Sequence, residues 1–161
     1  VERSTSVIVQ YLRMTSPLAW APIAVILLGI GSMPVIALIV LAATWPIALS
    51  TANGVRNVSK EWIKVSQTLG ATKQETLRHV VAPAISSHVL TGVRLALGVS
   101  WIVIVPAEML GVDSGLGFMV LNARDQLSYD GLAAAMFIIG LVGYFLDLGA
   151  QNLFKKVSKA F

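Results

Sequence analysis

Residues 33–49 read MPVIALIVLAATWPIAL, a run without a single charged side chain. An α-helix needs about 20 mostly apolar residues to cross a hydrocarbon core about 30 Å thick. Three other stretches approach this length, so the sequence predicts four membrane-spanning helices, at residues 7–30, 33–49, 87–105 and 131–150. The first stretch contains Arg13, Pro17 and Pro22, and we expect a broken or short span there.

The composition of the whole chain agrees with lipid as its solvent. Of the 161 residues, 56% are hydrophobic and 12% are charged, whereas a soluble domain carries about 25% charged residues. The formal net charge is +4, but the basic residues lie in short stretches between apolar runs and form no patch for nucleic acid. The absence of cysteine excludes disulfides and cysteine-ligated metals. We therefore predict an all-α integral membrane protein with no cofactor or metal of its own.

The distribution of basic residues predicts how the spans are oriented. Cytoplasmic loops retain Lys and Arg, and eight of the twelve lie either in segment 50–83 or after residue 150. Segment 111–130 instead has three Asp and one Arg. We expect four crossings, with both chain ends and segment 50–83 in the cytoplasm and segment 111–130 as an external loop. Because the chain begins with Val1 and not with Met, we also expect a fragment of a longer protein.

Segment 59–83 is too polar to span a membrane and too regular for a linker. Ser59 is placed to cap a helix on which Trp62, Val65 and Leu69 share one face. Gly70 should end this helix, because glycine tolerates the left-handed conformation that follows a last turn. The segment should therefore bend at Gly70.

A second helix should begin at Thr72, because Thr72 and Glu75 have the spacing of a capping box. It would place Leu77 and Val81 on one side until Pro83 interrupts the backbone bonding and the chain turns into the next span. The residues alone leave two alternatives open for this kinked unit. It could lie on lipid as an amphipathic helix, or it could dock into a groove on a soluble partner. The bend favours docking, because a helix lying on lipid gains nothing from a break in its middle.

The stretch KVSQTLGA at 64–71, followed by VVAP at 80–83, resembles the EAA loop of binding-protein-dependent ABC importer permeases. The pattern of that loop is Glu-Ala-Ala, three residues, Gly, nine residues, Ile, one residue and Leu-Pro. The whole spacing fits, and Gly70 and Pro83 keep their places. The departures from the pattern are Lys64 for Glu, Val65 and Ser66 for the alanines, Val80 for Ile and Ala82 for Leu.

Flanking motifs resemble the nitrate/sulfonate/bicarbonate (taurine-like) branch of these permeases. The motifs are SPLAWAP at 16–22, GVRLALG at 92–98, and AEM at 107–109 followed by SGLGF at 114–118. The resemblance covers residues 12–150. Because such permeases usually have six spans, this chain is similar to their last four.

This resemblance implies a type I importer permease of the bacterial inner membrane that carries a small anion such as nitrate, sulfonate or bicarbonate. Besides membrane lipid, it implies ABC ATPase subunits, a second identical permease copy and an external substrate-binding protein as partners. The chain has no G-x-x-x-x-G-K-[ST] loop, so we expect a transport subunit, not an enzyme, with ATP bound by a separate ATPase. The residues expected to make or shape the ATPase contact are Lys64, Val65, Ser66, Leu69, Gly70, Ala71, Thr72 and Pro83.

Five residues in and after the predicted span 87–105 share one helix face: Arg94, Gly98, Trp101, Val105 and Glu108. Ionisable side chains at membrane depth are costly and normally face the bundle interior or a water-filled cavity. We therefore expect Arg94, Gly98, Trp101 and Glu108 to line the translocation pathway or the seam between two copies. The alternative is that Arg94 extends to the inner surface and Glu108 lies among the outer headgroups.

Two other classes of function remain as alternatives. An intramembrane serine protease would use Ser114 with His79 or His88, but the predicted topology puts Ser114 outside and both histidines at the inner side. A catalytic base must reach its nucleophile at about 2.6–3.2 Å, so this reading is disfavoured. The other alternative is a channel or a structural membrane subunit that works without an ATPase.

Overall fold

A computed structural model describes residues 10, 14–110 and 112–158 of the chain, with side chains described as far as residue 154. The described residues form helices and connecting turns, and they contain no strand. This confirms the predicted all-α fold class. The elements are η1 (Pro17–Trp20), α2 (Ala21–Leu28), α3 (Ser32–Arg56), α4 (Lys60–Thr68), α5 (Lys73–Thr76), the π turn η2 (Leu77–Val81), α6 (Ala82–Glu108), α7 (Leu116–Asp125) and α8 (Tyr129–Ser158).

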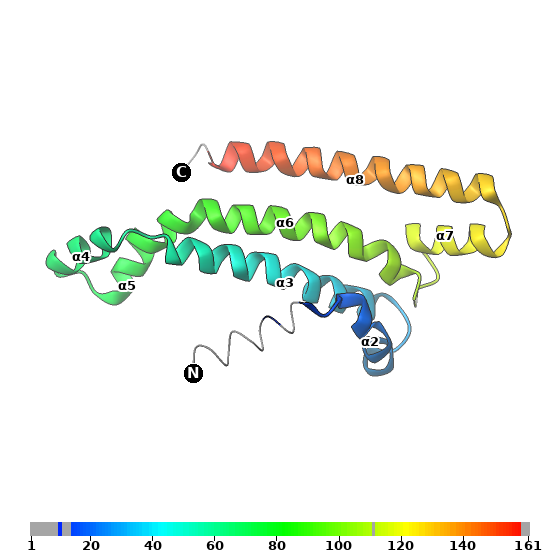
Figure 1. Cartoon of the computed structure of the whole chain (residues 1–161), viewed down its shortest axis with the longest axis horizontal. Coiled ribbons are helices and arrows are strands. Elements are labelled where there is room, and N and C mark those ends of the chain that lie inside the picture. Colours follow the sequence, from blue (N-terminus) through cyan, green and yellow to red (C-terminus); the bar gives the residue numbers. More distant parts are fainter. Residues whose placement is uncertain (1–9, 11–13, 111, 159–161) are drawn as a thin grey trace.

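Three long helices, α3, α6 and α8, run side by side in alternating directions (Figure 1). Among the described residues, the helical stretches long and apolar enough to cross a membrane are Ser32–Arg56, Lys73–Glu108 and Tyr129–Phe154. The predicted spans 33–49, 87–105 and 131–150 fall within them. The three helices therefore form the part of the fold that is suited to lipid.

Helices α3 and α6 make the most extensive contact in the described chain. Glycines permit their close approach, since a Cβ atom on Gly92 would lie 2.9 Å from Ser50 Cβ and 3.1 Å from Ile47 Cα. A Cβ atom on Gly54 would lie 2.8 Å from His88 Cβ. Small residues at such contacts let helix backbones pack tightly where lipid supplies no hydrophobic driving force. The α3–α6 pair is therefore the core to which the other elements attach.

Apolar side chains cover most of the outer surface of the long helices. Only 17% of the most apolar window of α3, and 6% of that of α8, is buried inside the described chain. Exposed apolar patches of this extent mark membrane or protein contacts. The long helices thus present surfaces for lipid or for further helices.

The first predicted span, 7–30, lies partly outside the described residues, which omit 1–9 and 11–13. Its described residues include the apolar helical stretch Pro17–Leu28, which is shorter than a membrane crossing. A tight link then leads into α3, with Gly29 at φ +80° and Gly31 at φ +138°. A crossing at 7–30 stays a prediction.

Short helices are attached at the two ends of the long bundle (Figure 1). At one end, called here the inner end, lie α4, α5 and the end of α8. At the other, the outer end, lie α2 and α7. Segments 50–83 and 111–130 are therefore at opposite ends, as the charge distribution requires. The predicted external loop contains a helix, α7, that the sequence pattern did not indicate.

Candidate functional site

Helix α4 begins and ends where the sequence predicts. The Ser59 hydroxyl accepts a hydrogen bond from the Glu61 amide at 3.3 Å. At the other end the Ala71 amide donates to the Ser66 carbonyl, and the Gly70 amide donates to the Gln67 carbonyl, both at 3.0 Å. With Gly70 at φ +80°, these bonds form a Schellman motif. The bend after α4 is therefore fixed by the backbone.

The second helix of the unit begins at the predicted capping box. The Thr72 amide and hydroxyl both donate to Glu75 Oε2 at 2.8 Å. The Glu75 amide donates in turn to the Thr72 hydroxyl at 3.3 Å. These reciprocal bonds satisfy amides that a helix start otherwise leaves without partners.

The prediction that Pro83 interrupts the helix is wrong. Helices α5, η2 and α6 form one continuous helical stretch, Lys73–Glu108, with Pro83 in the first turn of α6. The wider π turn Leu77–Val81 directly precedes Pro83. A π turn bonds residue i to residue i+5, and this spacing accommodates a proline that lacks the amide for a normal helical bond. The bent unit is therefore joined to α6 by an unbroken helix.

Ser66 holds the two short helices together from the inside. It is 7% exposed, donates to the Ile63 carbonyl at 2.9 Å, and shares a hydrogen bond with the Thr76 hydroxyl at 3.1 Å. Ser66 is one of the residues expected to make or shape an ATPase contact. It links α4 to α5 and also lines the groove beside α4, and its part in such a contact stays a prediction. Thr76 has no sequence signal of its own, because no local pattern pairs residues ten positions apart.

The face of α4 that adjoins Ser66 is apolar and open. Trp62, Val65 and Leu69 are 58%, 57% and 81% exposed. They line a groove of about 550 Å³ between α4 and the first turn of α6, with His79, Val80 and Pro83 on its other side. An open apolar groove on a rigid helical unit can hold an apolar ridge or helix of a partner. Among the residues predicted for the contact, Val65, Ser66, Leu69 and Pro83 line this groove.

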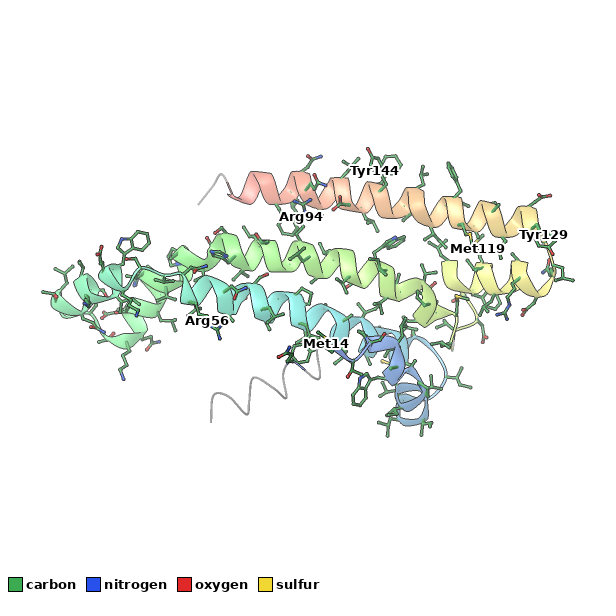
Figure 2. All side chains as sticks on the ribbon, in the orientation of Figure 1. Met14, Arg56, Arg94, Met119, Tyr129 and Tyr144 are labelled. Atoms are coloured by element: carbon green, nitrogen blue, oxygen red, sulfur yellow. The ribbon has the colours of Figure 1, made fainter. Side chains whose placement is uncertain are left out.

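The predicted pathway face of α6 meets α8 and α7 in the structure. Arg94 points toward α8 (Figure 2), and its Nη2 lies 4.0 Å from Asp147 Oδ1. Both side chains are about half exposed. Trp101 packs directly against Gly143, where a Cβ atom would collide with the indole. Between these contacts a cavity of about 130 Å³ is lined by Arg94, Gly98 and Asp147 among others.

Glu108 lies at the outer end of the same face. Its Oε2 accepts a hydrogen bond from the Gly117 amide of α7 at 2.8 Å. The structure thus separates Glu108 from Arg94 and Trp101, which contact α8. Whether this face lines a solute pathway stays a prediction.

The residues considered for a protease do not meet. His79 lies in the π turn at the inner end, where its Nδ1 is 3.1 Å from the Glu75 carbonyl. His88 packs against Gly54 in the α3–α6 contact. Ser114 lies at the outer end, between α6 and α7. Within the part of the chain that the structure describes, no group of His, Asp and Glu could hold a metal ion.

The fold and the inner unit define a class of protein: a multi-pass membrane protein with a rigid helical unit on one side of its bundle. Residues 1–159 match the family described as binding-protein-dependent transport system inner membrane component. The chain therefore belongs to this family. Membership in this family confirms the prediction that the chain is a component of an inner-membrane transport system and not an enzyme.

Named relatives agree with the predicted branch. The chain is 37% identical over 151 residues to the taurine transport system permease protein TauC of Escherichia coli, covering 94% of this chain and 55% of the relative. It is 39% identical over 140 residues to the bicarbonate transport system permease protein CmpB of Synechococcus elongatus, covering 86% and 50%. It is 34% identical over 143 residues to the nitrate import permease protein NrtB of the same species, covering 87% and 51%. The chain thus spans about half the length of the curated relatives it matches.

Proposed function

We propose that this chain forms the core of a permease subunit in an ATP-driven importer for a small anionic solute. The observation that carries the proposal is the bent unit at the inner end. It presents an open apolar groove and continues without a break into α6. Such a unit suits a contact that must transmit force, because it is joined to the membrane helix without an intervening loop.

In this proposal an ATPase subunit docks into the groove beside α4. Val65 and Leu69 supply the apolar contact, while Gly70, Ala71 and Thr72 set the angle between the two short helices. When ATP binding closes the ATPase pair, the unit is pushed and α6 tilts with it. The tilt alternately opens the pathway to the two sides of the membrane.

The remaining partners follow from the family and from the named relatives. A binding protein delivers solute from outside, and a second identical copy of this chain completes the pathway across the lipid bilayer. The solute belongs to the group that the relatives' names print: taurine, bicarbonate or nitrate. Arg94, Gly98 and Trp101 would face this pathway beside α8, where a guanidinium suits an anion.

The test uses two apolar residues of equal exposure at opposite ends of the bundle. Leu69 and Ile30 are each 81% exposed, in the inner unit and in the link before α3. We expect Leu69→Asp to lower ATP-dependent uptake about tenfold or more, because a charge would have to be buried in the ATPase contact. Ile30→Asp serves as the matched control and should leave uptake close to that of the wild type.

Uptake of labelled taurine, bicarbonate and nitrate is measured in cells that lack the native permease gene, together with membrane abundance and copurification of the ATPase subunit. Loss of both uptake and copurification in Leu69→Asp alone supports the proposal. Uptake that continues without ATP would instead favour the channel alternative. Full uptake by Leu69→Asp at normal abundance would show that the groove is not the docking site.

A further inference from the structure

Helix α7 lacks a cap of its own. It has ten residues, and its N-cap position is Gly115, which has no side chain to accept a hydrogen bond. The first amides of a helix have no partners within the helix, and they form the positive end of its dipole. An acceptor for the start of α7 must therefore come from elsewhere in the chain.

Glu108, the last residue of α6, supplies that acceptor. Its carboxylate accepts the hydrogen bond from the Gly117 amide at 2.8 Å. A carboxylate at a helix start is favourable both as a charged acceptor and through the dipole. Glu108 therefore caps α7 from the end of the preceding helix.

The contact between the two helices is close enough to exclude any side chain on α7 at this point. A Cβ atom on Gly117 would collide with the Val105 carbonyl and would lie 2.8 Å from Glu108 Cβ. Gly115 has φ +111°, which only glycine adopts without strain. The start of α7 is thus seated on the last turn of α6 by both packing and hydrogen bonding.

Helix α7 also connects α6 to α8. It lies between the outer end of α6 and the first half of α8 (Figure 1), and it contacts both. Direct contact between α6 and α8 is much sparser than that between α3 and α6. Glycines Gly140 and Gly149 of α8 have no atom within 4 Å of where a Cβ would stand. Together with the direct α6–α8 contacts at Trp101–Gly143 and Arg94–Asp147, the junction at Glu108 therefore connects α8 to the rest of the bundle.

We infer that Glu108 is a positioning residue that makes the α7–α8 hairpin follow α6 during transport. Because α6 is continuous with the inner unit, a tilt imposed at the inner end can reach the outer end along one helix. The contact between Glu108 and Gly117 then transmits the tilt of α6 to α7 and α8. This inference rests on the proposed function for the source of the tilt, but the junction itself rests on the contacts at Gly117.

The experiment compares Glu108→Ala with Glu108→Gln in the intact transporter. Glutamine keeps an oxygen acceptor at the same reach, whereas alanine removes it. Asp113→Ala is the matched control, because it removes an exposed acidic side chain from the same end. We expect Glu108→Ala to lower the maximal uptake rate about tenfold with an unchanged KM, while glutamine restores most of the rate.

A second measurement reports the junction directly. The chain has no cysteine, so a pair introduced at Ile102 in α6 and Met119 in α7 can be labelled with spin probes without background. Both side chains are exposed, at 73% and 46%. We expect the distance distribution to broaden in Glu108→Ala, and to stay narrow in Glu108→Gln and Asp113→Ala.

An unchanged distance distribution in Glu108→Ala would overturn the inference, whatever the uptake result. Equal loss of uptake in the alanine and glutamine variants, with narrow distances in both, would also overturn it and would assign the charge to the solute pathway. Absence of ATP-dependent uptake in the wild type would count against the proposed function alone. The spin-label distances between positions 102 and 119 would still test the junction.

Discussion

The two ends of α6 each carry a short helix, but these helices are held in different ways. At the inner end, α4 and α5 are capped by residues of their own segment, namely Ser59, Gly70 and the Thr72–Glu75 pair. At the outer end, α7 starts at a glycine and is capped by Glu108 of another helix. The inner unit is therefore defined by local bonds, and the outer one by a contact within the bundle.

This difference separates two kinds of rigidity. The inner unit keeps its bend through bonds between residues close in sequence, so it can hold its shape against a partner while the bundle moves. Helix α7 is held by its contacts with the end of α6 and with α8. Disturbing the bundle should therefore release α7 and leave the inner unit intact, and substitutions at each end can test this contrast.

The largest effect is expected for Gly117→Ala at the outer end. The added methyl group meets the Val105 carbonyl, and backbone atoms cannot move aside as a side chain can. Overpacking of this kind costs about 1–3 kcal/mol. We expect a lower midpoint of thermal unfolding in detergent and faster hydrogen exchange in α7.

The matched control for Gly117→Ala is Gly140→Ala in α8, a helical glycine with open space at its Cβ position. Its thermal midpoint should equal that of the wild type or exceed it, because alanine favours the helix. Equal midpoints for the two variants would contradict the close contact between α6 and α7.

A smaller effect is expected for Ser66→Ala at the inner end. The substitution removes the buried bond to the Thr76 hydroxyl, and loss of such a bond costs about 1 kcal/mol. Hydrogen exchange should accelerate in α4 and α5, with no change in α7. Thr68→Ala is the control, because the exposed Thr68 hydroxyl bonds only to the Lys64 carbonyl of its own helix. Acceleration spreading to α7 would show that the two ends are not independent.

The smallest effect is expected for Thr72→Ala. It removes one half of the capping box, and a lost cap of this type should weaken the exchange protection of α5 about fivefold. Thr72→Ser keeps the hydroxyl and should keep the protection. Unchanged exchange in Thr72→Ala would mean that the helix continuing into α6 is sufficient to hold α5 in place.

The inner unit could be predicted from the sequence because its signals are local. A capping residue, a glycine after the last turn and a Thr-Glu pair three apart each act within one helical turn. The long apolar helices could be predicted equally well, since burial in lipid requires continuous apolar runs. Of these residues, Gly70 also belongs to the stretch that carries the family resemblance.

The outer end could not be predicted in the same way. The cap of α7 is nine residues away, in another helix, and only the packing of the bundle brings Glu108 to Gly117. Pro83 was read as an interruption because the π turn before it has no sequence signal of its own. The hydrogen bond between Ser66 and Thr76 has no local sequence signal either, because the two residues belong to different helices.

The π turn at Leu77–Val81 has one more consequence. An α-helix advances about 100° per residue, and a π turn takes up one residue more than a normal turn. Rewinding this stretch into regular α-helix would leave every residue present but swing α4 to a different side of α6. The one extra residue in the π turn thus determines the direction in which the groove faces relative to α6.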